Sequence, residues 1–256
     1  MSKGNLYLIP SPIEQNSTKN FLISHQHEEI KKIKYFFVEN QKTARAILKK
    51  LELNTPLQEI IIFENNQNTK LTEIDHLIGP IYSGHDFGLI SDSGLPCIAD
   101  TGNMVVYYAH QNNIQIKPLI GPSSIFLSLM ASGFNGQNFE FVGYLPIDLN
   151  EKKKKLVSFQ ESINTENKTF IFIETPYRNN KLLGELIDIL NSNTRLCIAY
   201  NLTASDERII SKKVEGWRKN NLPILDKKPC IFLIKDRKST RLNSSHSQQS
   251  RMPSSA

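Results

Sequence analysis

The sequence lacks the features that mark membrane and secreted proteins. Within its 256 residues, no apolar run approaches the roughly 18–20 residues that a membrane-spanning helix needs. The apolar part of segment 1–13 is too short for a signal peptide. The three cysteines, Cys97, Cys197 and Cys230, are odd in number, widely spaced and set in apolar contexts, which is typical of reduced core residues. We therefore expect a cytoplasmic protein without membrane contact.

Several motifs of nucleotide-binding and hydrolytic enzymes are also missing. The sequence has no G-x-G-x-x-G, no P-loop, no G-x-S-x-G and no paired C-x-x-C. His25 and His27 form an H-x-H, but the surrounding Gln- and Glu-rich stretch favours a surface helix over a metal site. We therefore expect no metal ion.

The net charge is weakly basic, at +6 from 31 Lys and Arg against 25 Asp and Glu. Segment 236–256 is Ser-rich, has no apolar periodicity and resembles translated adapter or vector sequence, so we expect it to be foreign or disordered. Residues 239–256 carry Arg241 and Arg251 and no acid, which leaves a net charge of +4 on the remainder. That charge is compatible with a nucleic-acid partner and equally with an ordinary lysine-rich protein.

Strand-like and helix-like patterns alternate along the chain and predict an α/β fold. In the first half, apolar strands are expected at 6–9, 35–39, 60–63, 88–91 and 114–119, and helices at 42–53, 71–83, after Gly102 and at 121–132. Continuous apolar strands that alternate with helices are typical of a largely parallel sheet.

The pattern restarts after residues 135–138. Strands are expected at 139–145, 168–174, 195–202, 209–217 and 230–235, and helices at 148–162 and 177–190. The last strands follow one another directly, which indicates antiparallel neighbours in a mixed sheet. We expect an N-terminal α/β domain at 1–134 and a C-terminal α/β domain at 135–235, with a ligand crevice between them.

Polar turns follow the predicted strands at their carboxyl ends, where α/β proteins bind ligands. They are Pro10-Ser11-Pro12, Glu39-Asn40, Ser91-Asp92-Ser93-Gly94, Gly121-Pro122-Ser123-Ser124, Glu174-Thr175-Pro176 and Asn201-Leu202-Thr203. A single turn of this kind is a weak signal, because turns after strands are normally polar. Together the turns outline one crevice that spans both domains.

Several segments, taken in order along the chain, resemble the tetrapyrrole-methylase superfamily of S-adenosylmethionine-dependent methyltransferases. They include "LISDSGLPCIADTG", "LIGPSSIFLSLMASGF", "FEFVGYLP" and "FIFIETPYRN". Within it, the sequence is most similar to the ribosomal RNA small-subunit methyltransferase I branch, over nearly all of residues 5–235. The resemblance implies methyl transfer to a cytidine ribose 2′-oxygen in small-subunit ribosomal RNA. We also expect a homodimer.

The resemblance further implies which residues bind S-adenosylmethionine. The turn at Asp92 lines the methionine and ribose end, where glycine permits close approach and a carboxylate accepts hydrogen bonds. The expected set is Pro10, Ser91, Asp92, Ser93, Gly94, Leu95, Ser123, Ser124, Glu174 and Thr175. The later turn "ADTG" is expected to be structural, with Asp100 or Thr101 capping the next helix.

Methyl transfer to a ribose hydroxyl requires removal of its proton or stabilisation of its anion. The candidate groups at the crevice are Glu39, Asp86 and Glu174, which the sequence does not rank. Arg178, just after "ETPY", and the lysines Lys152 and Lys153 are expected to contact RNA phosphates. The lysine run 152–155 fits a solvated helix face equally well.

The second-strand motif departs from the branch. Members usually read Glu-Asp-Thr-Arg, where this chain has Glu39-Asn40-Gln41-Lys42. Two alternatives therefore stay open beside the RNA methyltransferase. One is a methylase that acts on a small molecule such as a porphyrin precursor, and the other is a cofactor-binding protein without methyl transfer.

Overall fold

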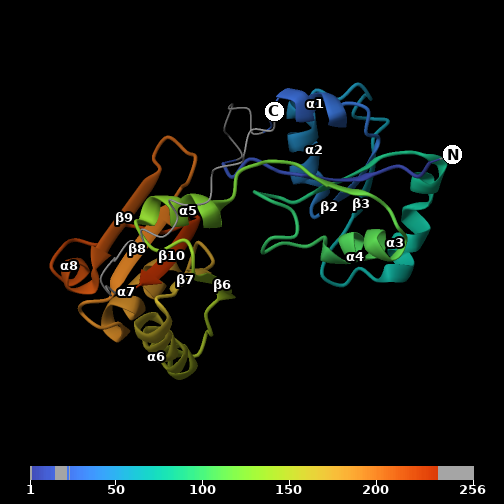
Figure 1. The fold of residues 1–256 in the computed structure, drawn as a ribbon. Coiled ribbons are helices and arrows are strands. Elements are labelled where there is room, and N and C mark those ends of the chain that lie inside the picture. Colours follow the sequence, from blue (N-terminus) through green and yellow to red (C-terminus); the bar gives the residue numbers. More distant parts are fainter. Residues whose placement is uncertain (1, 15–21, 23, 236–256) are drawn as a thin grey trace, which may run out of the picture.

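The structure is a computed structural model that describes residues 2–14, 22 and 24–235. The segment predicted to be foreign or disordered, 236–256, lies outside the described residues. Two five-stranded sheets form two α/β domains, which confirms the predicted fold class (Figure 1). In the described part of the chain, no helix has the length and apolar character that crossing a membrane requires.

The N-terminal sheet is fully parallel, in the order β3-β2-β4-β1-β5. Its strands are β1 (Leu6–Ile9), β2 (Tyr35–Val38), β3 (Ile61–Glu64), β4 (Phe87–Ile90) and β5 (Ile116–Pro118). Helices α1 (Ser24–Ile30) and α2 (Gln41–Lys50) pack on one face. Helices α3 (Leu71–Leu77), η1 (Gly79–Ser83) and α4 (Asn103–Gln111) pack on the other. Because the strands are parallel, the polar turns at their carboxyl ends share one edge.

The C-terminal sheet is mixed, as predicted, in the order β6-β7-β10-β8-β9. Its strands are β6 (Phe139–Tyr144), β7 (Thr169–Ile173), β8 (Arg195–Tyr200), β9 (Arg208–Lys213) and β10 (Cys230–Lys235). Only β6 and β7 pair in parallel, while β10 runs antiparallel to both β7 and β8. Helices α6 (Leu149–Glu166), α7 (Asn179–Ile189) and α8 (Val214–Arg218) cover one face.

The predicted strand at 209–217 is wrong in its second half. Strand β9 ends at Lys213, and Val214 begins α8. Trp217, in that helix, is buried and donates from Nε1 to the Leu196 carbonyl at 3.0 Å. Burial of this large side chain and its paired N–H favours a helical turn over continued strand pairing.

Helix α5 (Ser124–Ser132), which the sequence prediction assigned to the N-terminal domain, packs on the C-terminal sheet. Ile125 and Leu129 on α5 pack in one apolar cluster with Ile171 and Ile231 of that sheet. The amino end of α5 follows β5 directly, so it lies where the two domains meet.

Three turns at the carboxyl edge of the N-terminal sheet pack directly against one another. Ser11 and Gly94 form an antiparallel bridge, with backbone N–O distances of 2.7 and 3.2 Å. The Ser11 hydroxyl donates to the Ser91 carbonyl at 2.6 Å. A Cβ on Gly121 would lie 2.1 Å from Pro10 Cβ, so only glycine lets the turn after β5 approach the turn after β1.

We expect Gly121→Ala to destabilise the protein by about 1–3 kcal/mol, because the new methyl group overpacks this contact. The matched control is Gly184→Ala in α7, where a Cβ meets nothing within 4 Å. That change should stabilise the protein by about 0.5–1 kcal/mol, since alanine is the better helix former. Urea unfolding measures both, and the same effect from the two substitutions would contradict the packing argument.

Candidate functional site

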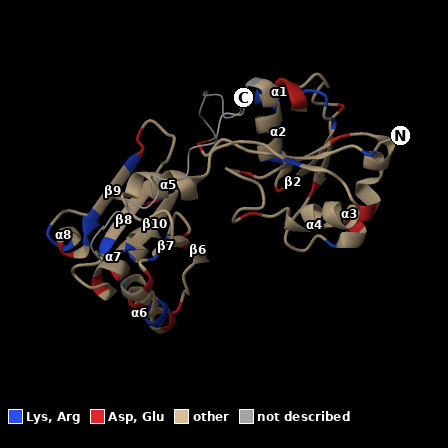
Figure 2. Cartoon of the chain, viewed as in Figure 1, with Lys and Arg blue, Asp and Glu red and all other residues tan. Residues whose placement is uncertain are grey.

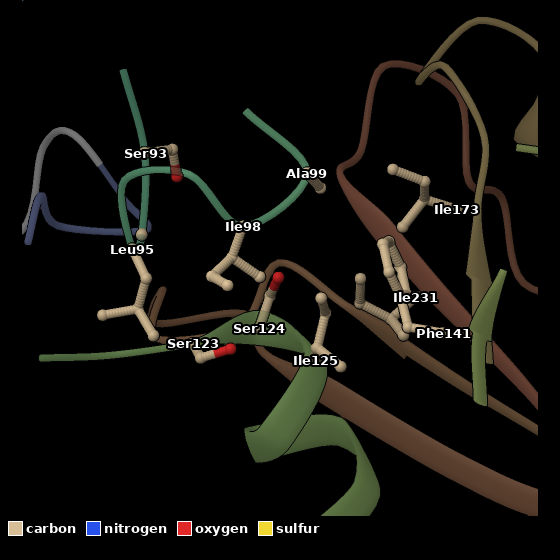
Figure 3. Close-up of a pocket in the computed structure, with 11 residues that line it drawn as sticks. Ser93, Leu95, Ile98, Ala99, Ser123, Ser124, Ile125, Phe141, Ile173 and Ile231 are labelled. Carbon is tan, nitrogen blue, oxygen red and sulfur yellow. The ribbon is translucent and has the colours of Figure 1, made fainter. Parts of the chain in front are cut away.

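A small crevice of about 80 Å³, partly open to solvent, lies between the two domains. Figure 3 shows Ser93, Leu95 and Ile98 on the N-terminal wall, facing Phe141, Ile173 and Ile231 of the C-terminal sheet. The remaining lining residues are Gly94, Ala99, Ser123, Ser124 and Ile125. The crevice thus joins the turn after β4 and the start of α5 to three strands of the second sheet.

The turn after β4 contributes Ser93, Gly94 and Leu95 to the crevice, whereas Ser91 and Asp92 of the predicted cofactor set do not line it. Gly94 has φ +73°, a left-handed conformation that favours glycine. A Cβ at this position would meet only the Pro122 carbonyl, at 3.7 Å. The glycine is therefore required by its backbone conformation rather than by lack of space. Ser91, just before the turn, is buried beneath it and accepts the Ser11 hydroxyl.

Acidic residues lie beside this turn, and Figure 2 shows red, acidic segments in the N-terminal loops that face the second domain. Burial and the charge of Glu39 raise the pKa of Asp92, against a hydrogen bond from Thr43. Burial and Glu39 also raise the pKa of Asp100, to about 7, although Ser91 donates a hydrogen bond to it. A side-chain hydrogen bond with Glu39 also raises the pKa of Asp100.

Asp100 therefore belongs to an acid cluster with Glu39 and Asp92, and the expectation of a structural cap was wrong. Gly102 is the N-cap of α4, without a side-chain cap among the described residues. The Thr101 hydroxyl instead donates to the Asn65 carbonyl at 3.2 Å. The loop before it is unusual, since Ala99 has φ +62° without being glycine. Such backbone conformations concentrate at functional sites.

The first turn of α5 presents hydrogen-bond donors to the crevice. Ser123 is the N-cap residue, with extended dihedrals, but its side chain makes no capping bond within the described part of the chain. The first N–H groups of a helix lack partners inside the helix and carry the positive end of its dipole. Together with the Ser124 hydroxyl they can bind a carboxylate or hydroxyl groups.

The turns after β1 and β2 support the crevice from behind. Pro10 packs against Gly121. Glu39 follows β2, and Asn40 caps α2 by accepting from the N–H groups of Lys42 and Thr43 at 2.9 and 3.1 Å. Asparagine and aspartate are equivalent N-caps. Asn40, which stands where the family usually has aspartate, therefore keeps the local helix cap and carries no negative charge.

Glu174 and Thr175 follow Ile173, the last residue of β7, which lines the crevice. Glu174 is 8% exposed, and its Oε1 accepts from Arg178 at 2.6 and 2.9 Å and from the Thr175 N–H at 2.7 Å. The Thr175 hydroxyl also accepts from Arg178 Nε, at 3.2 Å. Three donors, two of them from the Arg178 guanidinium, therefore converge on one oxygen of Glu174 and fix the turn that follows β7.

Asp86 is not at the crevice, which corrects its prediction as a catalytic candidate. It precedes β4, at the amino edge of the parallel sheet, whereas the crevice is at the carboxyl edge. Its Oδ1 accepts from the backbone and side-chain nitrogens of Asn5 at 2.7 and 2.9 Å. The acid therefore fixes the entry of β1 into the sheet.

Lys152 is also misplaced by the sequence prediction. Its side chain is only 6% exposed, and Nζ lies 2.6 Å from Glu185 Oε2 of α7. Lys152 lies on the buried face of α6, because it is one helical turn before Leu156, which is buried in the core. Lys153, the next residue, is exposed and stays a candidate for phosphate contact.

Sequence reasoning missed the apolar half of the crevice. Ile98, Ile125, Phe141 and Ile231 line it, and each lies in a segment whose apolar pattern also fits an ordinary core. A motif search that follows polar turns gives no reason to select them. Among the described residues, no group of three or more His, Cys, Asp or Glu side chains could hold a metal ion.

Comparison with known proteins finds close resemblance in sequence. No family model matches the chain. It is 30% identical to the Ribosomal RNA small subunit methyltransferase I of Bacillus subtilis, over 84% of this chain and 70% of that protein. It is 28% identical to the protein of the same name from Buchnera aphidicola subsp. Schizaphis graminum, over 90% of this chain and 78% of that protein.

Solved structures with the same fold are more distant in sequence. The methyltransferase CobJ superposes with a TM-score of 0.57 at 12% identity, over 92% of this chain and 97% of that one. A uroporphyrin-III C-methyltransferase from Thermus thermophilus, complexed with S-adenosyl homocysteine, gives 0.52 at 13% identity, over 91% and 97%. These likenesses establish the two-domain fold.

The raised pKa of Asp100, about 7, predicts a pH-dependent stability. Because the unfolded value is about 3.9, the folded state binds more protons between pH 4 and 7, and stability falls as pH rises through this window. Asp100→Asn removes the ionisable group. It should therefore stabilise the protein more at pH 8 than at pH 5, by on the order of 1 kcal/mol after allowance for solvent screening.

Urea unfolding at the two pH values measures this difference. Asp188→Asn, at an exposed position on α7, is the control and should change stability by the same small amount at both. An Asp100→Asn effect that does not vary with pH would contradict the raised pKa.

Proposed function

Since the chain belongs to the ribosomal RNA small subunit methyltransferase I family, we propose that it methylates a cytidine ribose 2′-oxygen of small-subunit ribosomal RNA, with S-adenosylmethionine as donor. The observation that carries the proposal is the crevice between the two sheets, built from the strand-end turns that the family resemblance selects. That the protein is a methyltransferase follows from its family membership. The identity of the methylated atom is what we propose.

The described residues fit S-adenosylmethionine. The open amino end of α5, with Ser123 and Ser124, suits the carboxylate of the methionine part. The carboxylate of Asp92 suits ammonium or ribose hydroxyl groups. Ile98 and Ile231 provide apolar walls for a flat ring such as adenine. When bound, the cofactor supplies a methyl group on a sulfonium.

The protein's own task is to position the ribose and to receive its proton. We assign proton acceptance to the cluster of Glu39, Asp92 and Asp100. Burial and the neighbouring acids raise the pKa of Asp92, and they raise the pKa of Asp100 to about 7, a value that suits a general base. Glu174 instead holds Arg178 in place through its hydrogen bonds.

Two rival functions differ in what they predict for substrates. The porphyrin-precursor methylase shares the fold, as the solved uroporphyrin-III C-methyltransferase does. The cofactor-binding protein without catalysis is suggested by the replacement at Asn40. The N-capping role of Asn40 weakens that second rival, because the change leaves the acid cluster complete.

We further propose that the enzyme is a homodimer in the cytoplasm. Phe126 and Met130 on α5 are 49% and 79% exposed, and such apolar side chains support an interface between two copies. The cysteines Cys97, Cys197 and Cys230 are free thiols, which is consistent with a reducing compartment where ribosomal subunits are found.

Asp92→Ala should weaken binding of S-adenosylhomocysteine by about 1.5–3 kcal/mol, the value of a charge-assisted hydrogen bond. Gly94→Ala should also weaken it, because alanine resists the φ of +73° that shapes the turn. Isothermal calorimetry measures the affinities, with Asp188→Ala as the control. Unchanged affinity in both crevice variants would remove this turn from the cofactor site.

The substrate is tested by mapping ribose methylation in small-subunit ribosomal RNA from cells with and without the gene. We expect one 2′-O-methylcytidine to disappear with the gene and to return when purified protein and S-adenosylmethionine are added to the unmethylated subunits. Methylation of a porphyrin precursor and not of RNA would support the first rival. Cofactor binding without turnover on either would support the second.

A further inference from the structure

Two exposed tyrosines stand at the carboxyl edge of the C-terminal sheet. Tyr144 is the last residue of β6 and is 56% exposed, and Tyr177 follows β7 and is 76% exposed. Tyr144 is the register partner of Ile173 across the parallel β6–β7 pair, and Ile173 lines the crevice. This tyrosine pair, Tyr144 and Tyr177, therefore lies on the rim of the proposed cofactor site.

The turn that carries Tyr177 is held by hydrogen bonds that leave its ring outside. The Arg178 N–H donates to the Thr175 carbonyl at 2.9 Å, which closes the turn. Glu174 points inward and accepts from Arg178 and Thr175. The ring thus contributes little to the core, although aromatic side chains bury large areas when they find a partner. Ile147, three residues after Tyr144, is 75% exposed and extends the apolar surface.

Cationic groups accompany the tyrosine pair. The Arg178 guanidinium is 39% exposed while two of its nitrogens bind Glu174. The backbone of Lys228 lies beside the amino end of α7, because Asn179 Nδ2 donates to its carbonyl at 2.6 Å, while its Nζ lies 5.0 Å from the centroid of the Tyr200 ring. The nearby carboxylate of Asp148 already accepts the N–H groups of the first turn of α6. The rim therefore combines exposed aromatic rings with the partly exposed guanidinium of Arg178, which is paired with Glu174 on one side.

This combination matches single-stranded RNA. A base offers a face to an aromatic ring and its phosphate offers a charge to arginine or lysine, and enzymes reach the ribose of unpaired nucleotides far more easily than that of a duplex. The rim adjoins the crevice on the β6–β7 side, because Tyr144 pairs in register with Ile173, which lines the crevice.

We propose that Tyr144 and Tyr177 stack on bases of the nucleotides that flank the methylated cytidine, while Arg178 contacts a phosphate. The inference rests on the proposed function and adds the residues that hold the RNA strand.

The test compares Tyr177→Ala, Tyr144→Ala and Tyr177→Phe with wild type. Loss of one stacked base should weaken binding of a single-stranded small-subunit RNA fragment by between about 5-fold and about 150-fold. The KM for methylation of assembled subunits should rise in parallel, while the Kd for S-adenosylhomocysteine stays unchanged. Tyr177→Phe keeps the ring and should bind RNA as wild type does. Tyr107→Ala, 50% exposed on α4 of the other domain, is the matched control and should change none of these values.

A salt series separates stacking from charge. Tyr177→Ala removes no charge, so the slope of log Kd against log salt should match wild type. Arg178→Ala should reduce the magnitude of that slope by about 0.7, the value for one phosphate contact with a single strand. Its melting temperature is measured alongside, because Glu174 loses its partner in this variant.

The outcomes separate this inference from the function on which it rests. Wild-type methylation of subunits with RNA affinity unchanged in both alanine variants would overturn the stacking role and leave the function standing. Losses seen only with assembled subunits, and not with the RNA fragment, would assign the tyrosine pair to a ribosomal protein and also overturn it. Absence of methylation and of RNA binding in the wild type would refute the proposed function itself.

Discussion

The whole site depends on the contact between strand-end turns at the carboxyl edge of the N-terminal sheet. Gly121 lies against Pro10 with no room for a Cβ, and Ser11 pairs with Gly94. These contacts fix the chain that leads from β5 to α5, and α5 packs on the second sheet. The close approach of the turns after β1 and β5 therefore sets the position of the C-terminal domain. That domain forms the opposite wall of the crevice.

Burial gives this crevice its two kinds of surface. Apolar residues from both domains make a wall that excludes water from a flat ring, and the same exclusion penalises the charges beside it. That penalty, added to mutual repulsion, raises the pKa of Asp92 and of Asp100. Glu174 is more buried than the three half-buried acids of the cluster, and its oxygen is held by Arg178. Carboxylates in one crevice thus acquire different roles from their neighbours.

The fold class and the polar half of the site could be predicted from the sequence, because both depend on local patterns. Alternating apolar segments predict strands and helices, and turns such as Ser91–Gly94 follow from their position after a strand. The predictions failed where tertiary contacts decide. Asp86 and Asp100 are each an acid near a strand of the same sheet, yet one lies at its amino edge and the other beside the crevice. The inward face of Lys152 likewise depends on Glu185, which lies on another helix.

The central claim is that the turn after β4, the start of α5 and the end of β7 form a single cofactor site. Amide hydrogen exchange with and without S-adenosylhomocysteine tests it most directly, because it locates binding along the whole chain. We predict that binding slows exchange in three separate segments, 91–99, 123–127 and 171–175, which only a shared crevice connects. A second groove lies between α3 and α4, where Asp75 and Tyr108 line it. Slower exchange confined to that groove, or no change in all three segments, would contradict the account.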